Sequence, residues 1–413
     1  MPALVVDPEQ RFTCQQCGRC CRRPWEIALT PGEVRAYRQA KVERYFRERE
    51  GSPEGADSDP FEDLPGGYAR IRKRADGACG FLSPDNRCRI HEELGAERKP
   101  LTCRLFPMRF HPAEDALVVT ASFACPTVVK NEGERLSAQS REVAALRKAW
   151  GGEYPERERP VEIVAGRPVS AESLMTLRQV LREMLDRPGP AGRPDLRANV
   201  LRMAHYLEDI SRHRAVRLPP SRFAEYLELT GRYAARSEQP LAARPPSALG
   251  RLLSRGFLFA VVAAREQVED RRGSGLRLDL RWRLLRLLAH AHGVGPGLRS
   301  LDLAAARRAR LDLEQPEVHG LVWNYLRATV QTLGTGRRPV LDELAVAVAF
   351  LNAAERLSAQ RAARDGKTWV DAASFREGLM EAVDLTHADS SGAGRLLATL
   401  SGGVEALYLY ASG

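Results

Sequence analysis

Four cysteines stand within eight residues in the stretch FTCQQCGRCCRRPW. The C-x2-C spacing forms a turn tight enough to direct two thiolates at one metal. It occurs here twice in overlap, as Cys14–Cys17 and Cys17–Cys20, with Cys21 directly after. Gly18 allows the backbone to turn sharply, so that amide N–H groups can also hydrogen-bond to sulfur. The stretch therefore predicts metal ligation.

Four further cysteines follow at wider spacing, and none of the last 288 residues is a cysteine. The N-terminal sequence MPALVVDPEQRF lacks the charged and apolar regions of a signal peptide, so we expect a cytoplasmic protein with reduced thiols. In a reducing compartment, clustered cysteines favour metal binding over disulfides. We therefore predict that the metal centre is built from Cys14, Cys17, Cys20, Cys21, Cys79, Cys88, Cys103 and Cys125.

Two arrangements fit eight thiols. One is a single [4Fe–4S] cluster with four ligands and the other thiols structural or in a second site, and the other is two closed four-cysteine zinc sites. The side chains of adjacent Cys20 and Cys21 are expected to diverge, so that one would serve a second metal, a neighbouring iron or the core. His91 and His111 are expected at a helix end and a turn rather than as ligands. Either centre is negative, and nearby arginines would offset its charge, namely Arg19, Arg22, Arg23, Arg70, Arg72, Arg104 and Arg109.

The elements that position these cysteines are predicted to be short. WEIALT alternates like a strand, and in TPGE the residues Thr30, Pro31 and Glu33 predict a capping box for a helix that continues to Glu50. YARIRKR predicts a strand, followed by the turn ADG. CRLFPMRF and LVVTASF predict a β-hairpin with Cys103 at one end and the last cysteine at the other.

Beyond about residue 130 the apolar residues recur with helical spacing. We predict a mainly α fold, in which a small cysteine-rich α+β metal-binding module of residues 1–130, with short strands and a β-hairpin, precedes a larger all-helical region, 131–413, with a linker at 151–170. The predicted helices are Ser173–Arg187, Leu196–Ile210, Ser221–Gly231, Leu249–Val268, Arg281–His292, Val318–Leu333, Val340–Arg356 and Ser374–Val383.

Composition excludes two classes of partner. The net charge is +10, but lysine occurs at only six positions, so the positive charge is almost all arginine. The sequence shows neither aromatic platforms nor a recognised nucleic-acid motif, so nucleic-acid binding is not expected. The longest apolar runs, FLFAVVAA and LAVAVAFL, are far shorter than the ~20 residues that span a bilayer. We expect both to be buried helices, with no membrane span.

The first stretch, followed by GACGFLSPDNRCRIHEELGAERKPLTCRLFP, resembles the cysteine-cluster proteins described as zinc- or iron-chelating domains. Their pattern is CxxCxxCC, then GxCxFL, CxIH and RPxxCRxFP, and here Lys99 replaces the arginine before Pro100. The continuation ALVVTASFACPTVVKN and the chain length resemble, more narrowly, the flagellin lysine-N-methylase family of bacteria.

The resemblance implies an iron–sulfur cluster or zinc, S-adenosylmethionine as a cofactor, and methylation of lysines on a protein partner such as flagellin. It also implies that seven of the cysteines, all except Cys14, are cluster residues. The chain has no glycine-rich fingerprint of a Rossmann-type methyltransferase, and no catalytic residue is identified. The alternative is a non-catalytic zinc- or iron-chelating module with a helical scaffold that binds a partner.

Overall fold

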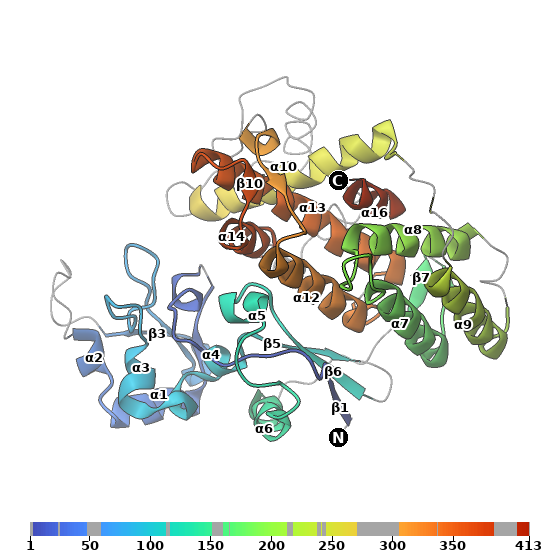
Figure 1. Cartoon of the computed structure of the whole chain (residues 1–413). Helices are drawn as coiled ribbons and strands as arrows, with labels where there is room; N and C mark the ends of the chain where they lie inside the picture. The colour runs from blue at the N-terminus through green and yellow to red at the C-terminus, as the bar shows by residue number, and fades with distance from the viewer. Residues whose placement is uncertain are drawn as a thin grey trace.

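The computed structural model describes residues 3–23, 25–47, 59–112, 116–150, 160–164, 166–212, 218–237, 241, 245–270, 305–336, 338–383 and 403–412. The prediction of a mainly α protein is confirmed. Figure 1 shows a smaller part with short helices and strands beside a larger assembly of long helices. Within the described ranges, no helix is both long and apolar enough to cross a membrane.

The smaller part is built on a three-stranded antiparallel sheet in the order β2-β4-β3. Its own core includes Ile27, Leu29, Phe61, Ile71 and Phe81, all almost completely buried. Its elements are β2 (Ala28–Leu29), α1 (Pro31–Gln39), α2 (Glu43–Arg47), β3 (Phe61–Asp63), η2 (Pro65–Gly67), β4 (Ala69–Ile71), α3 (Arg89–Leu94), η3 (Ala96–Arg98) and α4 (Leu101–Leu105), with the 3-10 turn η1 (Cys20–Arg22) before them.

The capping box that begins α1 is present as predicted. The Thr30 hydroxyl accepts a hydrogen bond from Glu33 N, and the Glu33 carboxylate accepts one from Thr30 N. The prediction of one helix to residue 50 is wrong, because the chain turns at Lys41, whose φ is 51°. Lys41 N bonds to Arg38 O and Val42 N to Tyr37 O, which is a Schellman C-cap. Lysine stands where glycine is usual, so the sequence gives no stop signal.

We expect Thr30→Ala to lower the free energy of unfolding by about 1 kcal/mol, because it removes the hydroxyl that accepts from Glu33 N. Urea denaturation of the metal-loaded protein measures the change. Thr30→Ser keeps the acceptor and should stay close to wild type. Equal losses in the alanine and serine variants would show that the cap does not stabilise α1.

The predicted β-hairpin is present as β5 (Met108–Pro112) and β6 (Ala116–Ala121), which pair antiparallel. Neither of the cysteines predicted at the ends of the hairpin lies on it. Cys103 is in α4, since Pro107 has no N–H to extend the ladder backwards, and Cys125 caps helix α5 (Pro126–Lys130). The N-terminal strand β1 (Ala3–Val6) pairs in parallel with β6, a contact between distant segments that the sequence did not predict.

The larger part surrounds α13 (Val340–Arg364), whose residues are mostly buried, as predicted for LAVAVAFL. The buried Phe257, Leu258 and Val261 confirm the second predicted buried helix, α10 (Ala248–Asp270). All predicted helices within the described residues are present, whereas Arg281–His292 lies outside them. The elements after α5 are α6 (Ser140–Trp150), which packs on α4 and β1, and then β7 (Glu162–Val164), β8 (Arg167–Pro168), α7 (Ala171–Leu185), α8 (Leu196–Arg212), α9 (Pro220–Arg236), α10 (Ala248–Asp270), η5 (Ala305–Arg307), β9 (Arg310–Leu311), α12 (Pro316–Thr332), α13 (Val340–Arg364), β10 (Trp369–Val370), α14 (Ala372–Val383) and α16 (Val404–Ala411).

A second core runs through these helices and reaches back to β6 and α5, where it includes Phe123 and Cys125. The hairpin and α5 therefore pack on the helical part, although they precede residue 130. Residues 151–159 of the predicted linker lie outside the described residues. The rest of it contains β7 and β8, which pair as a two-stranded sheet.

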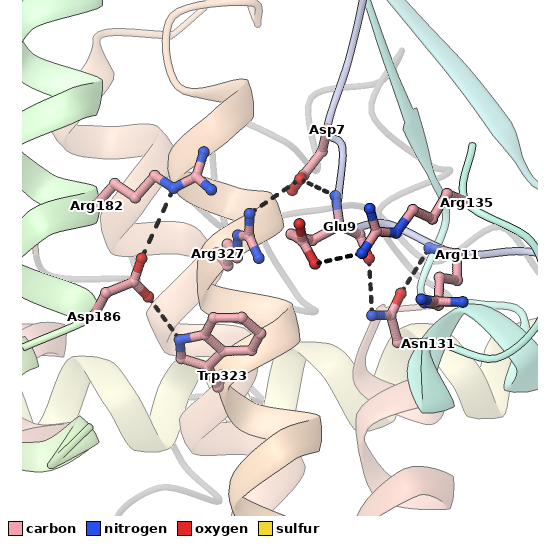
Figure 2. A network of polar contacts seen from close by, with 9 residues as sticks. All are labelled: Asp7, Glu9, Arg11, Asn131, Arg135, Arg182, Asp186, Trp323 and Arg327. Atoms are coloured by element: carbon pink, nitrogen blue, oxygen red, sulfur yellow. Dashed lines mark hydrogen bonds and ion pairs between the residues drawn. The ribbon is translucent and has the colours of Figure 1, made fainter. Parts of the chain in front are cut away.

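A polar network joins the end of β1 to the helices (Figure 2). Arg327 on α12 pairs with Asp7 at 3.3 Å, and both side chains are only 5–6% exposed. The Arg327 guanidinium also lies over the Trp323 ring, 4.9 Å from its centroid. On the other side, Asn131 accepts from Arg11 N at 2.7 Å. The N-terminal segment is thus fixed between α12 and the turn after α5.

Candidate metal centre

One cavity of about 660 Å³ gathers most of the cysteines. All of them except Cys79 line it, and Cys79 lies buried close enough for its charge to act on Cys21 and Cys103. All eight are free thiols. The structure therefore brings the cysteines predicted from the sequence to one region.

Five of the cysteines lie within a short helix or at its N-cap, namely Cys20, Cys21, Cys88, Cys103 and Cys125. Cys20 and Cys21 begin η1, and Cys79 N donates to Cys21 O at 2.7 Å. Cys88 forms an isolated bridge with Leu82 and then caps α3. Such positions fix the backbone beside these sulfurs through hydrogen bonds, and all five of these cysteines line the cavity.

Gly18 makes the first turn possible, as the sequence predicted. Its φ is 69°, and a Cβ at this position would lie 2.8 Å from Asn86 O. Arg22 reinforces the approach by donating from Nη2 to Asn86 Oδ1 at 2.6 Å. The turn that carries Cys20 is thereby pressed against the loop that leads to Cys88.

We expect Gly18→Ala to lower the free energy of unfolding by more than about 2 kcal/mol, because a positive φ and a contact with backbone oxygen act together. Metal content should fall with it. Gly166→Ala is the matched control, since Gly166 has a φ of 74° but nothing within 4 Å of its Cβ position. Equal losses in the two variants, measured by urea denaturation, would contradict a role for the close approach.

We call Cys14, Cys17 and Cys125 the outer group. Cys17 acts to raise the pKa of Cys125, and Cys14, together with Cys20, Cys88 and Cys103, acts to raise that of Lys99. The other five influence one another, and we call them the inner group, namely Cys20, Cys21, Cys79, Cys88 and Cys103.

Within the inner group, burial opposes ionisation. It raises the pKa of Cys79 to about 11 and that of Cys103 well above the ordinary thiol value. The hydrogen bond between Cys20 and Cys21 lowers the pKa of Cys20 to about 6 and raises that of Cys21. Several thiolates at this place thus require a nearby positive charge, which a metal centre supplies.

The sulfurs of Cys20 and Cys21 lie 3.9 Å apart, so the expected divergence of these side chains is wrong. The short helical turn η1 brings them together. Two thiolates on one tetrahedral zinc lie about 3.8 Å apart, given bonds of about 2.3 Å, so this pair fits a shared metal. Neither in this cavity nor elsewhere in the described residues do three Cys, His, Asp or Glu side chains lie close enough together to hold a single ion.

The positively charged residues that line the cavity are only partly those predicted from the sequence. Among the seven arginines, Arg104 lines the cavity, and its buried Nε has no hydrogen-bond partner. Arg70 instead pairs with Glu62, and Arg19 with Glu377 of α14 at 2.7 Å. Lys99 lines the cavity in their place, and although burial would lower its pKa, thiolates including Cys14 raise it. The only feature of the sequence that singled out Lys99 is that it replaces the arginine of the RPxxCRxFP pattern.

Sequence reasoning set His91 aside as a ligand and missed helix α6 as part of the cavity wall. His91 lines the cavity from the last turn of α3, and its buried Nδ1 has no hydrogen-bond partner among the described residues. His111 lies on β5, where its ring bonds to Thr120 at 3.0 Å. Helix α6 forms part of the wall with Glu142, Ala145 and Leu146, a placement that only the tertiary structure reveals.

Comparison with known families agrees with this region. Residues 13–126 match the model of the CxxCxxCC family, described as a "Putative zinc- or iron-chelating domain". The match supports metal binding by the cysteine-rich part and does not extend to the helices after it. No curated protein and no solved structure matches the chain.

Proposed function

We propose that the inner group of thiols binds a metal centre around which residues 1–130 fold, and that this centre is a [4Fe–4S] cluster. The observation that carries the proposal is the gathering of seven cysteines on one cavity of about 660 Å³, with the eighth buried beside it. Metal binding of the zinc- or iron-chelating kind is what the family match supports.

The spacing of the ligands favours a cluster over one zinc ion. A structural zinc site needs four ligands at about 2.0–2.3 Å from one point, and no three described ligand side chains meet in this way. A four-iron cluster is bound by four cysteines at its corners, so its ligands surround a larger volume. Four of the inner thiols line this cavity and Cys79 lies buried beside it, an arrangement that suits that shape, and one thiol remains for a structural role. Bound there, a cluster would supply a redox-active or Lewis-acidic iron.

Anaerobic purification followed by elemental analysis and an absorption spectrum tests the proposal. We expect iron and acid-labile sulfide near four per chain and absorbance near 400 nm that dithionite bleaches. One or two zinc ions per chain without iron would overturn the cluster and leave the four-cysteine zinc sites. A full-length protein that folds without any metal would overturn the metal centre itself.

A second candidate function is S-adenosylmethionine-dependent methylation of lysines on a protein partner such as flagellin. The cavity volume supports it, because about 660 Å³ lies in the range of roughly 300–1,000 Å³ for small-molecule sites. The wall from α6 and Phe12 carries no cysteine and leaves room beside the metal. The helices 131–413 would then bind the substrate protein, and in the non-catalytic alternative they bind a partner only.

Thermal unfolding of the cluster-loaded protein with millimolar S-adenosylmethionine tests this second function. Methylase activity requires a rise in the melting temperature and transfer of a labelled methyl group to purified flagellin. An unchanged melting temperature with an intact cluster would favour the non-catalytic module. Under either function we place the protein in the cytoplasm, where thiols remain reduced.

A further inference from the structure

Away from the cysteines, a second hollow of about 180 Å³ lies where α10, η5 and α13 meet, near the end of α16. Figure 1 shows α10 crossing over α13 on the side of the helical part that also holds α16. Buried Leu258, Ala306 and Ala353 line the base of the hollow, and Ser254 and Asn352 lie beside them. The floor is therefore apolar with two small polar groups.

Four arginines stand around this hollow, Arg251, Arg255, Arg307 and Arg356, and all four are exposed. Arg251 donates to Pro246 O at 2.6 Å. The other three make no hydrogen bond or ion pair with any described residue. The guanidinium donors of these three lining arginines are thus available to a ligand in the hollow.

The charge around the hollow is unbalanced. Arg251 and Arg255 are one helical turn apart on α10, where like charges at i and i+4 repel each other. The acidic residue on the wall, Glu355, already pairs with Arg197 at 3.2 Å. An anion in the hollow would relieve this repulsion without displacing an internal ion pair.

We propose that this hollow binds a compact phosphate-bearing solute. Guanidinium groups match the geometry of phosphate oxygens and bind them with two parallel hydrogen bonds. The volume of about 180 Å³ is below the range of ordinary small-molecule pockets, so the bound group is small. A nucleic-acid strand would need an extended groove with aromatic platforms, and none of the described residues that line this hollow is aromatic.

Isothermal titration of the full-length, metal-loaded protein at fixed ionic strength tests the site. The ligands are inorganic phosphate, pyrophosphate and adenosine triphosphate, which separate a free anion from the phosphate end of a larger molecule. We expect one site per chain for at least one of them. Arg255→Gln and Arg307→Gln should each weaken binding by about ten- to a hundredfold, because each removes a charged hydrogen-bonding group.

Arg308→Gln is the matched control, since Arg308 is also exposed and follows Arg307 but does not line the hollow. It should change the dissociation constant by less than about twofold. No binding at millimolar ligand, or the same loss in all three variants, would overturn the proposal. Arg255-dependent binding of a single-stranded oligonucleotide, with none of pyrophosphate, would overturn it in favour of a nucleic-acid surface. Circular dichroism verifies that each variant is folded.

Discussion

Cys103→Ser is expected to remove the metal and to unfold the cysteine-rich part of the chain. Cys103 is held on α4, and its charge interacts with those of Cys79, Cys88 and Cys20. Metal binding and folding are coupled in such modules, with apparent binding energies of about 10–16 kcal/mol for structural zinc. We therefore expect metal per chain to fall to a small fraction of wild type, measured by elemental analysis after anaerobic purification.

The control for this prediction comes from the outer group. Cys14 is exposed, unlike Cys103, and belongs to the outer group, so Cys14→Ser should retain most of the metal. Hydrogen exchange should show lost protection within residues 59–112 in the Cys103 variant and not in the Cys14 variant. Full metal content after Cys103→Ser, or equal losses in both, would contradict the division into two groups.

Arg327→Leu is expected to lower the free energy of unfolding by about 3–5 kcal/mol, because it leaves the Asp7 carboxylate buried without its partner. Both side chains are 5–6% exposed, so water cannot replace the lost contact. The substitution also removes the guanidinium that covers the Trp323 ring. Urea denaturation measures this loss, provided that the slope of the unfolding free energy against urea concentration is unchanged.

Two variants make this second prediction specific. The double variant Asp7→Leu/Arg327→Leu should recover much of the stability, since a buried pair replaced by apolar residues costs little. Arg135→Leu removes the Glu9–Arg135 pair, whose atoms are 4.0 Å apart and whose side chains are about half exposed, so it should cost below about 1 kcal/mol. A loss of this small size in Arg327→Leu would show that the buried pair does not anchor β1.

Much of the local structure was determined by the sequence alone. The capping box at Thr30, the sharp turn at Gly18 and the β-hairpin all depend on residues close together in the chain. The long helices follow from apolar residues at helical spacing, and α13 was expected to be buried because its apolar residues surround it. Interactions of this kind act between residues that are close along the chain, so their patterns are visible in the amino-acid sequence.

The tertiary structure decided what the distant segments do together. It pairs β1 with β6, places Lys99 rather than most of the predicted arginines beside the thiols, and closes the cavity with α6. It also leaves Cys14 exposed while it buries Cys79, although both line up as ligands in the sequence. The eight cysteines indicated a metal centre because thiolates in a reducing compartment bind metal. Which of them meet is fixed by contacts across more than a hundred residues, and these depend on packing that no local pattern contains.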